Sequence, residues 1–206
     1  YQEGSLLENN CFPRKGMDTG WNSVFLRFWH EIAVHSSKLE NASIGDSKFK
    51  LVPYNKGGDF RKWYGNREYV VNWLNDGEEI KNRRDVAKNK PTIRNQDFFF
   101  REGFTWSTIS SSNFSARFSP KGALFDNGGC TIFSDSDLFL FGALCNSVVG
   151  RRYLEFLSPT LNFQPGDIGR IIFIRPNSEA MRILKENTEQ LIDLCCTDWN
   201  SLETSW

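Results

Sequence analysis

The 206-residue sequence predicts an α+β fold, with twisted and mostly antiparallel sheets and with packing helices toward the C-terminus. Short aromatic and β-branched stretches run through residues 98–133 and are separated by turns of Gly, Pro, Asn and Asp, as is typical of antiparallel strands. Longer apolar stretches with helical spacing follow from residue 138 onward. The hydrophobic fraction of 39%, with 18 Phe and 7 Trp, supplies enough apolar surface for a stable core.

Three segments are expected near the start of the chain. Residues 24–32 carry apolar side chains on both faces, which predicts a strand inside a sheet. Residues 36–48 are polar and lack periodicity, so they predict a loop. A short strand is expected at residues 49–53.

A turn-rich stretch at residues 54–59 separates that strand from the next one. Residues 68–73 are rich in aromatic and branched side chains and predict a second clear strand. A charged helix is expected at residues 78–88, and Pro91 stops any helix beyond it.

The last third of the sequence is mainly helical in pattern. Residues 134–137 have the composition of a helix start, and residues 138–157 predict an apolar helix or a helix pair that bends near Gly142 or Gly150. A short buried strand is expected at residues 168–174.

A final amphipathic helix is expected after a cap formed by Asn177 and Ser178. Its apolar positions fall on roughly one face: Met181, Leu184, Leu191 and Leu194. The sequence opens at Tyr1 without an initiating Met, which fits an excised fragment. We expect residues 1–176 to form one domain and residues 177–206 to form a helical segment that leads into the remainder of a longer protein.

Several classes of protein are disfavoured by what the sequence lacks. Its five cysteines form no CxxC pair and two of them are adjacent, so reduced thiols in the cytoplasm are expected. No apolar stretch approaches the roughly 20 residues that a membrane span needs, so no membrane partner is expected. The motifs GxxxxGKS/T, GxGxxG, GxSxG and HExxH are absent, as are an Asn-Pro-Pro-Tyr tetrapeptide and an early Gly-rich loop. We therefore expect no catalytic, cofactor-binding or metal-binding residues in this chain.

The formal net charge is zero, but the charges are unevenly spread. Residues 48–94 hold 12 basic and 6 acidic side chains, whereas the parts on either side are acidic. Such a distribution can give a neutral protein one positive face, although an ordinary solvated surface also explains it.

The most informative stretch is residues 54–69 (YNKGGDFRKWYGNREY), where cationic and aromatic side chains alternate after two adjacent glycines. Arg and Lys neutralise phosphates, Asn pairs with adenine or phosphate, and aromatic rings stack on unpaired bases. A carbohydrate site or a core-packed turn would have a similar composition. The candidate nucleic-acid-binding residues here are Asn55, Lys56, Arg61, Lys62, Trp63, Tyr64, Asn66 and Arg67.

Two further stretches carry polar side chains suited to DNA. Residues 106–118 are rich in serine, which provides short and adaptable hydrogen-bonding groups, although an ordinary hairpin explains this composition equally well. Residues 14–22 form a basic turn that contains glycines. The candidates in these two stretches are Trp106, Ser110, Ser112, Asn113 and Arg117, and Arg14, Lys15, Thr19 and Asn22.

Taken in order, four stretches resemble the C-terminal half of one protein family: residues 14–32, 52–79, 103–118 and 157–166. The family is that of the PglX-type adenine-specific DNA methyltransferases of bacterial phage-defence (BREX) systems, and the resemblance spans nearly the whole chain. Its most distinctive part is KGGDFRKWYGNREYVVNW. The family's G-x-x-T-G-x-N turn corresponds to Gly16, Thr19, Gly20 and Asn22, with a departure at Trp21, where relatives commonly carry an acidic residue.

The resemblance implies an enzyme that transfers a methyl group from S-adenosylmethionine to adenine within a short non-palindromic DNA site. It implies that the catalytic domain and its cofactor lie upstream of this region, and that residues 1–176 form a target-recognition domain. The partners would be double-stranded DNA, the upstream methyltransferase domain and, in addition, other proteins of the defence system.

The resemblance also suggests roles for individual residues. We expect one group to position the DNA backbone: Lys56, Arg61, Lys62 and Arg67. We expect a second group to meet base edges: Asn22, Asn66, Ser110, Ser112, Asn113 and Arg117. Two alternatives remain. One is a module that docks other defence proteins through residues 54–69, which we call the aromatic-basic loop. The other is a carbohydrate-binding module that stacks sugars on Trp63, Tyr64 and Trp106.

Overall fold

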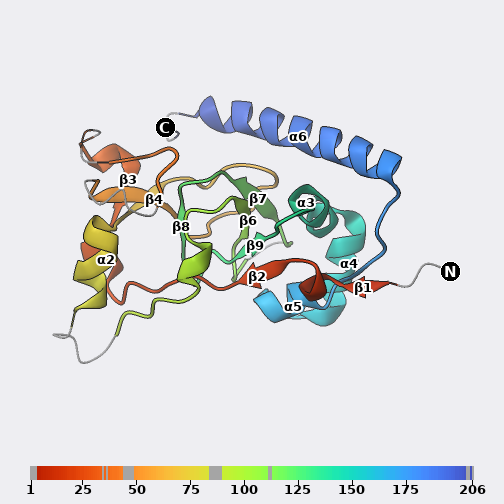
Figure 1. The fold of residues 1–206 in the computed structure, drawn as a ribbon, viewed down its shortest axis with the longest axis horizontal. Helices are drawn as coiled ribbons and strands as arrows, with labels where there is room; N and C mark the ends of the chain where they lie inside the picture. The colour runs from red at the N-terminus through yellow and green to blue at the C-terminus, as the bar shows by residue number, and fades with distance from the viewer. Residues whose placement is uncertain are drawn as a thin grey trace.

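Two four-stranded sheets form the centre of the part of the chain that this computed structural model describes, which is residues 4–33, 35, 37–43, 49–83, 90–110, 113–202 and 205. Helices lie mainly at one end of these sheets and along one side (Figure 1). The expected α+β fold with mostly antiparallel sheets and helices toward the C-terminus is therefore confirmed.

The first sheet is antiparallel throughout. Its strands are β2 (Phe12–Arg14), β9 (Thr131–Phe133), β6 (Gly103–Trp106) and β7 (Ala116–Ser119), in that order across the sheet. Thr105 lies opposite both Arg117 and Thr131, so these three residues share one face. The opposite face carries Phe104, Trp106 and Ala116, which belong to a hydrophobic cluster with the helices.

The second sheet consists of β3 (Leu26–Phe28), β5 (Tyr69–Asn72), β4 (Leu51–Asn55) and β8 (Leu124–Phe125). Its strands pair antiparallel except for β4 and β8, which are parallel. A third, two-stranded sheet joins β1 (Ser5–Leu6) to β10 (Ile172–Phe173). A 3-10 turn at Leu7–Asn9 follows β1.

The strand predictions in the first half of the chain have mixed outcomes. The strand expected at residues 68–73 is confirmed as β5, and the one expected at residues 49–53 lies two residues later, as β4. The expected loop at residues 36–48 contains no helix or strand among its described residues.

The prediction of a buried strand over residues 24–32 is wrong. The segment divides into α1 (Asn22–Phe25), the edge strand β3 and a 3-10 turn (Trp29–Glu31). Only Phe25 and Leu26 are buried, whereas Phe28 is 37% exposed. Apolar residues on both faces misled the prediction because a sheet edge also tolerates them at the surface.

The helix expected at residues 78–88 begins earlier. This holds only for the bounds of α2 (Leu74–Lys81): Asn75, Asp76 and Gly77 have positive φ, so regular right-handed helix begins at Glu78, as expected, and residues 84–89 lie outside the described residues. A further 3-10 turn at Gln96–Phe98 precedes β6.

The expected helix pair over residues 138–157 is present as α3 (Leu138–Asn146) and α4 (Val148–Leu157). The break lies at Ser147, between the two expected glycines, because the Ser147 hydroxyl accepts a hydrogen bond from the Gly150 amide (3.0 Å) and so begins a new helix. The strand expected at residues 168–174 is wrong at its start, since Ile168 belongs to α5 (Pro165–Gly169), whose first turn contains a proline.

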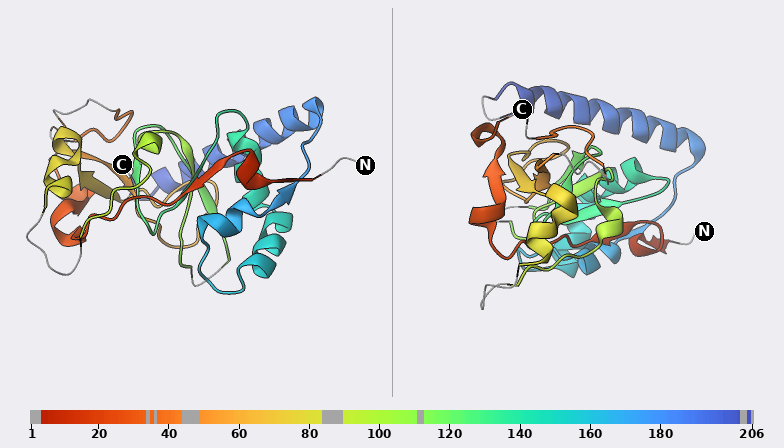
Figure 2. Two further views of the ribbon diagram at one scale, coloured as in Figure 1. Left: turned by 60° about the horizontal axis from the view of Figure 1, so that its bottom comes forward. Right: turned by 60° about the vertical axis from the view of Figure 1, so that its left-hand side comes forward.

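The final helix α6 (Ser178–Asn200) runs along one side of the sheets (Figures 1 and 2). Its predicted cap is confirmed, because the Asn177 side chain accepts a hydrogen bond from the Ala180 amide (2.9 Å). The predicted apolar face is only half right: Met181 and Leu184 pack on the core, but Leu194 is 68% exposed. The inner face continues instead through Thr188, Ile192 and Trp199, with Cys195 and Cys196 packed on the core between the last two, so that a contact recurs every three to four residues.

The hydrophobic core consists of two clusters, one between the first sheet and the helices and one around the second sheet. Where β4 faces β7, the side chains between the two sheets are polar. The Asn55 amide of β4 donates to the Ser119 hydroxyl of β7 at 2.7 Å, and Thr105 and Arg117 are buried on the same face as Ser119. The five cysteines are all free thiols.

The end of the molecule that carries α4 presents apolar side chains to solvent. Val148 and Val149 are more than half exposed and Phe156 is 85% exposed. Ile172 and Ile174 beside them are also exposed, and Val149 helps to line a hollow of about 640 Å³. Among the described residues, no helix combines the length and apolar character that crossing a membrane requires.

Candidate nucleic-acid interface

The turn at residues 126–129 (DNGG) is the point where the predicted segments meet. The Asp126 carboxylate is nearly buried and accepts hydrogen bonds from the Tyr54 hydroxyl (2.7 Å) and from the Gly128 amide (2.6 Å). The same carboxylate forms an ion pair with the Lys56 ammonium group at 3.1 Å. Burial raises the pKa of Tyr54 well above its usual value, and the neighbouring Asp126 charge raises it further.

The basic turn near the N-terminus reaches this point through its backbone. The Met17 amide donates to the carbonyl oxygen of Phe125 (2.9 Å), and the Asn127 amide donates to the carbonyl oxygen of Met17 (3.0 Å). The Tyr54 hydroxyl also donates to the Met17 carbonyl oxygen at 3.2 Å.

The serine-rich stretch reaches the same turn from the other side. The Ser107 hydroxyl donates to the carbonyl oxygen of Gly58 (2.7 Å), and the Thr108 hydroxyl donates to that of Asn127 (2.7 Å). Three stretches that are far apart in sequence, each a candidate in its own right, therefore form one continuous region around residues 126–129.

Two glycines make this close approach possible. Gly57 has a φ of 93°, and a Cβ atom there would lie 2.7 Å from the carbonyl oxygen of Gly128. A Cβ atom at Gly129 would lie 2.1 Å from the carbonyl oxygen of Asn55. Any side chain at either position would push the two turns apart.

Cations gather around the turn. Arg94 donates to the Asn127 side-chain oxygen at 3.1 Å, and the carbonyl oxygen of Lys15 accepts a hydrogen bond from Asn95 at 2.9 Å. Lys15 lies two residues before Met17, whose backbone pairs with Phe125 and Asn127, so the Lys15 backbone lies beside the turn. We call Lys15, Lys56, Arg94 and Asn127 the junction surface.

Arg94 and Asn127 were missed by sequence reasoning. Arg94 ends the basic segment 48–94, so the charge distribution held a signal for it. Asn127 was read only as part of a turn. Its side-chain oxygen accepts a hydrogen bond from Arg94 and its backbone carbonyl oxygen accepts one from Thr108. No local sequence pattern reveals these two partners.

The second half of the aromatic-basic loop binds to the rest of the chain. Arg61 forms an ion pair with Asp198 of α6 (2.9 Å) and lies over the Trp199 ring at 5.0 Å. Lys62 donates to the carbonyl oxygen of Asn146 at the end of α3 (2.8 Å), and burial lowers its pKa. These two cations hold the loop against the helices.

The remaining residues of this loop shape its backbone. Trp63 has a φ of 71° and bonds on both sides to β7, through its amide to Ala116 (2.9 Å) and through its carbonyl oxygen to Phe118 (2.7 Å). The Asn66 side chain donates to the carbonyl oxygen of Asp59 at 2.8 Å and so closes the loop. Arg67 donates to the hydroxyl of the buried Tyr64.

Several other candidates lie in the interior or outside the described residues. Trp106 is fully buried, and its indole donates to the carbonyl oxygen of Phe163 (2.9 Å). Thr19 is buried and donates to the exposed Asn22 (2.8 Å). Asn55 is buried as well, Ser112 lies outside the described residues, and Arg14 lies over the Phe98 ring at 5.2 Å.

Arg117 differs most from its expected place at a base edge. It is 1% exposed, and among the described residues its guanidinium has one hydrogen-bond partner, the Ser107 hydroxyl, which accepts from one nitrogen at 3.3 Å. Its Nε and Nη1 atoms have no hydrogen-bond partner among the described residues. Burial lowers the pKa of this guanidinium to about 10.

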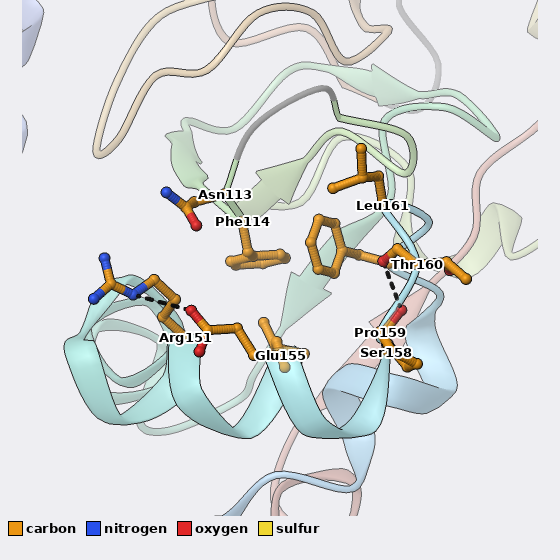
Figure 3. Close-up of a pocket in the computed structure, with 10 residues that line it drawn as sticks. Asn113, Phe114, Arg151, Glu155, Ser158, Pro159, Thr160 and Leu161 are labelled. Atoms are coloured by element: carbon orange, nitrogen blue, oxygen red, sulfur yellow. Dashed lines mark hydrogen bonds and ion pairs between the residues drawn. The ribbon is translucent and has the colours of Figure 1, made fainter.

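Asn113 and Ser110 lie in the middle of the serine-rich stretch. Asn113 is exposed at the rim of a small hollow against α4, across from Arg151 and Glu155 (Figure 3). The Ser110 amide donates to the carbonyl oxygen of Leu161 at 3.0 Å. The hollow holds about 150 Å³, which is below the roughly 300 Å³ at which ordinary ligand pockets begin.

The arrangement argues against two other kinds of site. A sugar-stacking platform on Trp63, Tyr64 and Trp106 is not formed, because the last two rings are buried. Among the described residues, no group of three or more His, Cys, Asp or Glu side chains is placed to hold a metal ion.

Comparison with known proteins gives two close relatives and no match to a protein-family model. The chain is 42% identical over 205 residues, 97% of its length, to the adenine-specific methyltransferase PglX of Lacticaseibacillus casei (strain Zhang). It is 38% identical over 199 residues, 93% of its length, to the adenine-specific methyltransferase BrxX of Escherichia coli O9:H4 (strain HS). The chain spans only 17% and 15% of the lengths of these relatives.

Proposed function

The chain is a relative of the PglX/BrxX-type adenine-specific methyltransferases, as its sequence predicts, and we propose that it is the DNA target-recognition region of such an enzyme. In this proposal it grips duplex DNA and reads a short site, while methyl transfer takes place on another part of a longer protein. An enzyme that modifies adenine must turn the base out of the duplex. It therefore needs a second body that holds the opened DNA in register.

The observation that carries this proposal is the convergence of three candidate segments on residues 126–129. Phosphate contacts set register and base-edge contacts set sequence, so a recognition surface needs cations and amides side by side. Lys15 and Arg94 supply cations of the junction surface, Lys56 adds a cation that is paired with Asp126, and Asn127 supplies an amide. Asn22 and Asn66 extend the same proposal as further base-edge candidates.

The helix-bound cations have a different part in this proposal. Arg61 and Lys62 are engaged by α6 and α3, so they hold the loop in position. Direct contact with DNA then falls mainly to the junction surface.

Neither of the two hollows described above fits S-adenosylmethionine. The hollow at Asn113 is too small, and the larger one beside Val149 is lined by residues without charge. This cofactor carries a sulfonium, an ammonium and a carboxylate group, which such an apolar lining cannot pair. We therefore assign the cofactor and the catalytic groups to another part of the longer protein.

The test is a salt titration of the chain with duplex DNA that contains the methylation site of the parent enzyme. Affinity should fall as salt rises, with a logarithmic slope of about −0.9 for each phosphate contact. The double variant Lys15→Ala with Arg94→Ala should bind more weakly and reduce the slope by about 2. The control is Arg152→Ala with Lys185→Ala, which removes two exposed cations on α4 and α6 and should leave both quantities unchanged.

A flat salt response of the unmodified chain would exclude the recognition function. If the Lys15 and Arg94 variant left DNA methylation by the full enzyme unchanged but prevented assembly with other defence proteins, the protein-docking alternative would replace it.

A further inference from the structure

Arg117 stands out because its charge is buried without a counter-charge. It is 1% exposed, and among the described residues it takes part in no ion pair. The Ser107 hydroxyl is a neutral partner. Two nitrogen atoms of the Arg117 guanidinium have no hydrogen-bond partner among the described residues. A buried cation in this state is costly, and proteins retain such groups mainly where function needs them.

Arg117 is connected to the aromatic-basic loop through Ser107 and through the neighbours of Arg117 in β7. Ser107, which accepts from Arg117, donates in turn to the carbonyl oxygen of Gly58. Trp63 bonds to the residues on both sides of Arg117 in β7. We call residues 57–60 the cover, because this part of the loop meets Ser107, the partner of Arg117, at Gly58 and precedes the residues that are held by α6, α3 and β7.

The tip of the cover has few ties to the rest of the protein. The Ser107 hydroxyl donates to the carbonyl oxygen of Gly58 (2.7 Å), and the Asn66 amide donates to that of Asp59 (2.8 Å). Gly58, Asp59 and Phe60 are exposed, and both Gly57 and Gly58 have positive φ. Segments with few buried contacts open at the lowest free-energy cost.

We propose that Arg117 is a concealed DNA-contacting residue and that the cover moves aside to bring its guanidinium to a backbone phosphate of bound DNA. A neutral base edge would satisfy the free N–H groups but would leave the charge uncompensated. A phosphate accepts hydrogen bonds from these N–H groups and also compensates the positive charge. This inference rests on the proposed function and adds to it a residue that becomes available only when the cover opens.

The first variant to test is Arg117→Met, which keeps the length of the side chain and removes its charge. We expect its melting temperature to rise, because an uncompensated buried charge is lost. We also expect its DNA affinity to fall about tenfold and its salt slope to shrink by about 1. Arg117→Lys should recover part of the affinity. Arg101→Met, which removes a cation paired with Asp135, is the control for the loss of an arginine.

The second variant, Ser107→Ala, tests the movement of the cover. It removes a bond that holds the closed form, so a larger fraction of molecules should be competent to bind. We expect tighter DNA binding than that of the unmodified chain. An arginine with a purely structural role predicts no such gain.

The outcomes separate this inference from the proposed function. If the unmodified chain does not bind DNA, both fail. If it binds and Arg117→Met binds equally well, or Ser107→Ala shows no gain, only the inference fails. If inorganic phosphate raises the melting temperature of the unmodified chain but not of Arg117→Met, while both bind DNA alike, Arg117 holds a free anion and the DNA contact is rejected.

Discussion

At the scale of single residues, Asp126 was not among the candidates selected from the sequence, yet its carboxylate joins three groups from two segments of the chain. Its carboxylate joins Tyr54, Lys56 and the Gly128 amide, and so ties β4 to the turn after β8. A buried carboxylate is stable in such a place because each of its two oxygens accepts at least one hydrogen bond.

Replacing Asp126 by Asn should destabilise the protein by roughly 2 kcal/mol, because the charge-assisted bonds to Lys56 and Tyr54 are lost. Urea unfolding of the variant measures this cost. Asp59→Asn, at an exposed position on the loop tip, is the matched control and should change the free energy of unfolding by less than about 0.5 kcal/mol. Equal stability of the two variants would show that Asp126 does not hold the turn.

Cys145 gives a prediction about pH. Burial raises the pKa of its thiol to about 12, from a usual value of 9.0. Between these two values the unfolded chain has released the proton and the folded chain has not, so stability is fully present below about pH 9 and is lost as pH rises toward about 12. Cys145→Ala should therefore lose less stability than the unmodified chain between pH 9 and 11, as measured by urea unfolding under reducing conditions.

This comparison has an internal reference. Cys11 is also buried, and its thiol pKa is raised by burial and by the nearby Cys145. The variant should thus keep a smaller alkaline loss. An alkaline loss identical to that of the unmodified chain would refute the assignment to Cys145.

At the scale of elements, local signals predicted what local forces determine. The cap at Asn177 and the strand at residues 68–73 follow from short-range chemistry, and both are confirmed. The strand expected at residues 24–32 failed because its neighbours decide whether a strand is central or at an edge. The inner face of α6 was missed in its second half because Thr188 and Trp199, rather than the leucines, follow the line of contact.

The contact between α6 and the aromatic-basic loop yields a test at this scale. Trp199 is buried, lies under Arg61 and is close to Gly65. Trp199→Ala should cost roughly 3 kcal/mol of stability and speed hydrogen exchange in the last two turns of α6. Leu194→Ala, on the exposed side of the same helix, should do neither.

If Trp199→Ala left exchange in these turns unchanged, the packing of α6 would not depend on this contact. The loop would then need other contacts to hold Arg61.

At the scale of the whole molecule, the sequence indicated the right segments but not their meeting point. Residues 14–22, 54–69 and 106–118 were each candidates, and the structure joins them around residues 126–129. That junction depends on pairings between residues far apart in the chain, such as the parallel pairing of β4 with β8. No local periodicity encodes such a pairing.

The roles of the side chains were harder to predict than their neighbourhood. Arg61 and Lys62 looked like phosphate ligands, yet they bind α6 and α3. Composition cannot distinguish a cation that faces a partner from one that stabilises its own chain, because both need the same side chain. Direct DNA contact by the remaining candidates stays a prediction.

The apolar end of α4 has a practical consequence for work with the isolated chain. The formal net charge is zero and the isoelectric point is about 6.9, so near neutral pH little electrostatic repulsion keeps two molecules apart. An exposed apolar surface formed by Phe156, Val148 and Val149 then favours association with another protein molecule. Sulfate or phosphate buffers strengthen apolar association. Preparations should therefore remain monodisperse longest at a pH well away from 7 and in the absence of these salts.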